Sequence, residues 1–144
     1  MVKLLKGNGR FDFNIVGESH GQNDIQRIVG KKISGGHDYD CLAALVYDEK
    51  NQYDKNAVAV CIVYASGSIV QVGFLSRQDA VKYRKNVSES GGLNPEGMLC
   101  RAKIVGGWSD AGDEGHFGVR LDLLLPLTFG TAASWPTWSQ RLLQ

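Results

Sequence analysis

Three stretches of the chain alternate between apolar and polar residues, namely 10–16, 97–105 and 116–125. Successive side chains of a β-strand point to opposite faces, so this pattern predicts three half-buried strands. The inward positions would be Phe11, Phe13 and Ile15 in the first strand, Met98, Cys100, Ala102 and Ile104 in the second, and Phe117, Val119, Leu121 and Leu123 in the third.

Two further stretches, 39–48 and 57–63, are apolar almost throughout. A run of this kind is typical of a strand that is covered on both faces. Within the second run we expect Val58, Val60 and Ile62 to lie in the core. A sixth strand, residues 68–75, follows a predicted turn at residues 65–67.

Two stretches have helical spacing. In residues 22–29, Ile25, Ile28 and Val29 fall at i, i+3 and i+4, which predicts a short helix closed by Gly30. Residues 76–86 predict a second, amphipathic helix. Ser76 would cap it, with an acid at Asp79 three residues later. Its buried face would carry Ala80, Tyr83 and Val87, and its solvent face Lys82 and Arg84.

Six short strands and two short helices predict a mainly β fold, a small six-stranded barrel of the OB-like or SH3-like kind. We assign the barrel to residues 10–127, after a lead-in at residues 1–9. The glycine-rich, acidic residues 106–115 predict an exposed, mobile hairpin loop. The tail, residues 128–144, contains Trp135 and Trp138 in a polar stretch, and these rings would pack either on the barrel or on a partner protein.

The composition fits one domain with its own core, since 43% of the 144 residues are hydrophobic. No apolar run approaches the roughly 20 residues that cross a bilayer, so we expect a cytoplasmic protein without membrane contact. Three cysteines without close spacing, Cys41, Cys61 and Cys100, are expected to be reduced and buried.

The residues offer little for catalysis or metal binding. His20, His37 and His116 have no ligand spacing with one another or with the cysteines. The chain contains no phosphate-binding glycine loop and no nucleophile motif, so we expect neither an enzyme nor a cofactor. The net charge of +1 also restricts nucleic-acid contacts to a short, local surface.

The residues around the predicted strand at 57–63 carry a more specific signal. Residues 53–60 run Tyr-Asp-Lys-Asn-Ala-Val-Ala-Val, residues 72–77 run Val-Gly-Phe-Leu-Ser-Arg, and residues 15–17 run Ile-Val-Gly. This set resembles the HIRAN family over about residues 10 to 125. The resemblance implies a module that grips the 3′ end of single-stranded DNA in DNA repair or processing, beside a helicase or nuclease partner.

The resemblance also implies roles for individual residues. Tyr53 and Asp54 would grip the end, with the carboxylate accepting a hydrogen bond from the terminal hydroxyl. Phe74 would stack on a base, Arg77 would hold a phosphate, and His20 would lie at the rim. DNA-binding relatives have a basic and aromatic run where this chain has Glu18-Ser19-His20-Gly21, so we expect modest affinity.

Each of these residues also has a structural interpretation. Asp54 and Asn56 are residue types that hold turns by bonding their own backbone, and Gly73 would serve a turn before the helix. Phe74 could belong to the core, and Arg77 could be solvated. The alternative function is a protein-interaction adaptor that uses the barrel and the tryptophan-containing tail.

Overall fold

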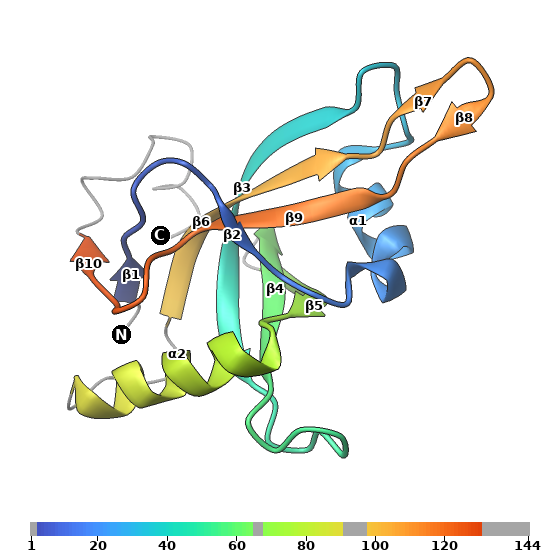
Figure 1. The fold of residues 1–144 in the computed structure, drawn as a ribbon. Helices are drawn as coiled ribbons and strands as arrows, with labels where there is room; N and C mark the ends of the chain where they lie inside the picture. The colour runs from blue at the N-terminus through green and yellow to red at the C-terminus, as the bar shows by residue number, and fades with distance from the viewer. Residues whose placement is uncertain (1–2, 65–67, 91–97, 131–144) are drawn as a thin grey trace.

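A computed structural model describes residues 3–64, 68–90 and 98–130. It is mainly β with two helices, as the sequence predicts (Figure 1). The turn predicted at residues 65–67 and the tail tryptophans Trp135 and Trp138 lie outside the described residues. The helices are α1 (Gln22–Val29) and α2 (Arg77–Glu89), and a 3-10 turn spans Glu18–His20. The strands are β1 (Lys3–Leu5), β2 (Phe13–Asn14), β3 (His37–Tyr47), β4 (Val58–Tyr64), β5 (Ser68–Phe74), β6 (Met98–Gly106), β7 (Ser109–Asp110), β8 (Asp113–Glu114), β9 (Phe117–Asp122) and β10 (Phe129–Gly130).

One sheet contains eight of these strands. Its main path is β10-β1-β6-β3-β4-β5, and β9 pairs with both β6 and β2. All pairs are antiparallel except β1 with β6. Among the described residues, the segment that follows β2 pairs with β5 only through an isolated bridge between Val16 and Phe74. The two backbone hydrogen bonds of this bridge have N···O distances of 2.8 Å. The ladders do not close into a ring, so the mainly β fold is confirmed and the barrel is not.

The main core lies on one face of this sheet, under both helices. Its residues include every predicted inward position of β6 and β9, and also Val58, Val60 and Ile62 of β4. These predictions are confirmed. They could be made from the sequence because alternation along a strand determines which side chains face the core. All three cysteines are free and buried, also as predicted.

Helix α2 begins where the sequence predicts. Ser76 is its N-cap, and the side-chain oxygen of Ser76 accepts a hydrogen bond from the Asp79 N–H at 3.1 Å. Ala80, Tyr83 and Val87 are buried against the main core. The helix continues to Glu89, one turn beyond the predicted end.

The opposite face of the sheet carries a second apolar cluster. It consists of Leu4, Leu42, Ala44, Ala59, Cys61 and Val63. β3 and β4 are therefore apolar on both faces, which accounts for their unbroken apolar runs. Leu4 comes from the predicted lead-in, which forms β1 and pairs with β6.

The first predicted strand is much shorter than expected. Only Phe13 and Asn14 form β2, and Phe11 has a φ of 52° that no strand residue adopts. Ile15 belongs to the main core, whereas the Phe11 ring lies beside Arg101 and Lys103, which alternate with the core-facing residues of β6. The predicted common face of Phe11 and Ile15 is therefore wrong, because the left-handed backbone breaks the alternation. The predicted loop 106–115 contains the exposed hairpin β7–β8.

Candidate nucleic-acid interface

The connection between β3 and β4 forms a turn held by its own side chains. Asn51 Oδ1 accepts hydrogen bonds from the Tyr53 and Asp54 N–H groups, both at 2.9 Å. Asp54 Oδ1 accepts one from the Asn56 N–H at 2.9 Å. The side chain that bonds the turn backbone beside Asp54 is therefore that of Asn51, whereas Asn56 takes part through its main chain. We call residues 51–57 the Tyr53 turn.

The turn presents an aromatic ring and a carboxylate to solvent. The Tyr53 side chain is 79% exposed, more than any other large hydrophobic residue among those described. Asp54 is half-buried, and one of its oxygens is used by the Asn56 N–H. Its second oxygen has no hydrogen bond within the described part of the chain. A carboxylate oxygen of this kind can accept a further proton donor.

Arg77 lies next to this turn. Its Nη2 donates a hydrogen bond to the Tyr53 carbonyl oxygen at 3.3 Å, and the side chain is exposed. The first turn of α2 thus places a guanidinium beside the Tyr53 and Asp54 pair. Three of the residues singled out from the sequence are brought together here.

Arg84 of α2 anchors the Tyr53 turn through hydrogen bonds to its backbone, a role that the sequence did not reveal. Its Nε donates to the Asn56 carbonyl at 2.7 Å and its Nη2 to the Ala57 carbonyl at 2.8 Å. The guanidinium carbon lies 3.9 Å from the centre of the Tyr47 ring. The predicted solvent position of Arg84 is wrong, since only 18% of the side chain is exposed. An amphipathic pattern cannot distinguish a solvated arginine from one that reaches back to backbone carbonyls.

Phe74 and His20 occupy a different place. Both line a pocket of about 240 Å³ with Gly17, Gly21 and residues 71–73, and neither Tyr53, Asp54 nor Arg77 lines it. The Phe74 side chain is half-buried against the second apolar cluster. The five predicted residues therefore form two groups, the Tyr53 turn with Arg77, and the pocket with Phe74 and His20.

Gly73 has a steric role between these groups. A Cβ at this position would come within 2.6 Å of the Val16 carbonyl oxygen, in the bridge that joins the β2 end to β5. Only glycine allows the two backbones to approach this closely. Gly73 is thus structural, as the sequence suggests, through close approach rather than through a turn.

The residues that depart from the family pattern also have structural partners. Glu18 Oε2 accepts a hydrogen bond from the Val119 N–H at 3.4 Å. Gln22 Nε2 donates to the Glu18 and Phe117 carbonyls, and Gln22 Oε1 accepts from the Phe117 N–H. These contacts tie the 3-10 turn and α1 to β9. Glu18 therefore serves as an acceptor for the sheet backbone.

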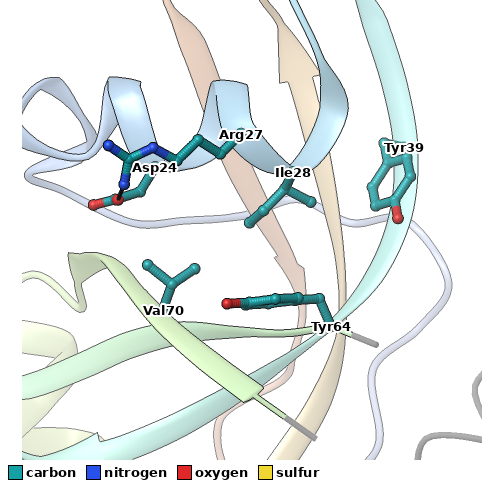
Figure 2. Close-up of a pocket in the computed structure, with 6 residues that line it drawn as sticks. All are labelled: Asp24, Arg27, Ile28, Tyr39, Tyr64 and Val70. Carbon is teal, nitrogen blue, oxygen red and sulfur yellow. Dashed lines mark hydrogen bonds and ion pairs between the residues drawn. The ribbon is translucent and has the colours of Figure 1, made fainter. Parts of the chain in front are cut away.

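A further pocket, of about 340 Å³, lies between α1 and the sheet (Figure 2). Figure 2 shows Ile28 of α1 above the Tyr64 ring, Val70 of β5 to the left of the ring, and Tyr39 on β3. Tyr39 and Tyr64 are 42% and 40% exposed. Arg27 at its edge is already paired with Asp24, at 3.3 Å. The pocket is largely apolar with polar edges, and the sequence pattern gave no sign of it.

The described residues contain no group of three or more His, Cys, Asp or Glu side chains that could hold a metal ion. Within the same ranges, no helix has the length and apolar character needed to cross a bilayer. Comparisons of the chain with protein-family models, with curated proteins and with solved structures found no match.

Proposed function

We propose that this protein binds single-stranded DNA and recognises the free 3′ end at the Tyr53 turn. The observation that carries the proposal is the exposed Tyr53 ring beside the Asp54 carboxylate, with the Arg77 guanidinium bonded to the same turn. The sequence resemblance to the HIRAN family supports the same role for these three residues.

Each group has a physical task. The 3′-hydroxyl of a strand end can donate a hydrogen bond to Asp54, whereas the esterified oxygen of an internal nucleotide has no proton to give. A terminal 3′-phosphate would be repelled by the carboxylate. Stacking of a base on Tyr53 contributes about 1 to 3 kcal/mol without base preference, and Arg77 neutralises one phosphate.

Phe74 and His20 would contact the strand at a second position. They line their own pocket beside the bridge between Val16 and Phe74, and another nucleotide of the same strand would occupy this pocket. Because the Phe74 ring is half-buried, only part of it is available for stacking. We infer that most of the end recognition rests on the Tyr53 turn.

The test compares short oligonucleotides of one sequence that end in a 3′-hydroxyl or a 3′-phosphate, measured by fluorescence anisotropy at low salt. We expect tighter binding of the hydroxyl form. Asp54→Asn should reduce this preference, because it removes the repulsion while the amide oxygen still accepts the Asn56 N–H. Asp113→Asn, at an exposed position in the β7–β8 hairpin, is the control. Equal binding of both oligonucleotides by the unmutated protein would refute end recognition and favour the adaptor function.

A further inference from the structure

The segment before β2 crosses the sheet (Figure 1). A cleft rich in arginine lies between this segment and the sheet. It has a volume of about 390 Å³ and is formed by residues 9–11 together with β3, β6 and β9. Its charged and aromatic lining consists of Arg10, Phe11, Asp40, Arg101, Lys103 and Arg120. None of these residues belongs to the Tyr53 turn or to the pocket of Phe74 and His20.

The floor of the cleft is fixed by Phe11. This residue is buried and has a φ of 52°, a conformation that a bulky side chain adopts only when its surroundings enforce it. The preceding loop is anchored because the Gly9 N–H donates to Asp122 Oδ1 at 2.9 Å. The Phe11 ring centre lies 5.0 Å from the Arg101 guanidinium carbon and 5.1 Å from Lys103 Nζ. One ring therefore positions two cations through its π face.

Three of the four cations that line the cleft have no ion pair within the described residues. Lys103 is neutralised by Asp38 at 3.0 Å and by Asp40 at 3.6 Å. The guanidinium groups of Arg10, Arg101 and Arg120 make no hydrogen bond or ion pair with any residue that the structure describes. Arg101 Nε is buried and has no hydrogen-bond partner among the described residues. The exposed guanidinium groups of Arg10 and Arg120 are therefore available to an anionic ligand.

We propose that this arginine cleft is a phosphate-binding site. A guanidinium presents several N–H donors in a planar fork that matches phosphate oxygens, and three such groups line one cleft. A single carboxylate, that of Asp40, also lines it, and its charge is directed to Lys103. The phosphate can come from the backbone of a nucleic-acid strand or from a small phosphate compound, and both present the same oxygens to the arginines.

The test uses two probes on the full chain. Pyrophosphate represents the small source, measured by isothermal titration calorimetry. An eight-nucleotide thymidine strand ending in a 3′-phosphate represents the backbone, because the Tyr53 turn would disfavour that end. The variant carries Arg10→Gln and Arg120→Gln, two exposed side chains whose loss leaves the Phe11 packing intact. Lys85→Gln, on the exposed side of α2, removes one charge elsewhere as the control.

We expect the double variant to weaken binding of the preferred probe by about tenfold or more, as for lost charge-assisted hydrogen bonds. If the strand is the ligand, its log-log salt slope should also fall by about 0.7 per lost phosphate contact. Tighter binding of the strand identifies a backbone site, and tighter binding of pyrophosphate identifies a small phosphate ligand. The proposal would be overturned if neither probe bound, or if the double variant bound the probes with the same affinity as the unmutated protein. Asp54→Asn should leave binding of either probe undiminished, which separates this site from end recognition.

Discussion

Replacing Arg84 should destabilise the protein and loosen the Tyr53 turn together. Arg84→Met retains an apolar stem over the Tyr47 ring and removes both hydrogen bonds to the turn carbonyls, at 2.7 and 2.8 Å. The Ala57 carbonyl keeps a second donor, the Asp48 N–H at 2.9 Å, so the Asn56 carbonyl bears most of the loss. The exposed ion pair with Glu49 contributes little.

The expected cost follows from these contacts. A hydrogen bond from a charged group contributes about 1.5 to 3 kcal/mol, and loss of the cation–π contact adds about 0.5 to 1 kcal/mol. Because one carbonyl keeps another partner, we expect the total to lie at the low end of that sum, at about 3.5 kcal/mol. For a chain of this size this corresponds to a fall in Tm of about 10 °C.

Urea unfolding, followed by circular dichroism, measures the change in the free energy of unfolding directly. Lys82→Met, on the exposed face of the same helix, is the matched control and should change it by less than about 0.5 kcal/mol. Arg84→Lys keeps the charge without the planar fork and should fall between the two. If Arg84→Met cost no more than the Lys82 control, Arg84 would not hold the turn, and this account of the site would be wrong.

Three further predictions concern the core. Tyr83→Phe should leave stability unchanged or raise it by about 1 kcal/mol in the same unfolding assay, because the buried Tyr83 hydroxyl has no hydrogen-bond partner in the described part of the chain; a loss above 1 kcal/mol would reveal one. Val60→Ala should cost about 2 kcal/mol, and an unchanged thermal midpoint would contradict its burial in β4. Burial, with a smaller contribution from the Asp40 charge, raises the pKa of Cys41 to about 12, and burial also raises the pKa of Cys100. Both thiols should therefore stay protonated and resist alkylation at pH 8 until the protein is unfolded, so rapid labelling of the native protein would refute this.

Much of the fold could be predicted from local patterns. Alternation correctly gave the buried faces of β6 and β9, and the Ser76 cap gave the start of α2, because both depend on neighbours in sequence. The parts of the fold that the sequence did not predict depend on long-range contacts. β1 forms because residues 3–5 find an edge of β6 more than ninety positions away, and nothing in its own short pattern specifies that partner.

The same holds for the candidate sites: the sequence could indicate one of them and not the other. The Tyr53 turn is built from side chains within a few residues of one another, so the sequence could indicate it. The arginine cleft collects residues from positions 9 to 120 around a phenylalanine whose backbone leaves the strand pattern. Alternation predicted that Phe11 faces inward, and it could not show that the Phe11 ring meets Arg101 and Lys103.

β3 pairs with β6 through residues 37–44 and with β4 through residues 42–47. Only Leu42, Ala43 and Ala44 therefore have a partner strand on both sides, and all three are buried. In hydrogen–deuterium exchange these amides should be among the slowest to exchange, since the segment is buried and has a partner strand on both sides. The arginine cleft lies along the first half of β3, and the Tyr53 turn follows the second half. Each end can fluctuate open on its own while this three-residue segment keeps its amide protons.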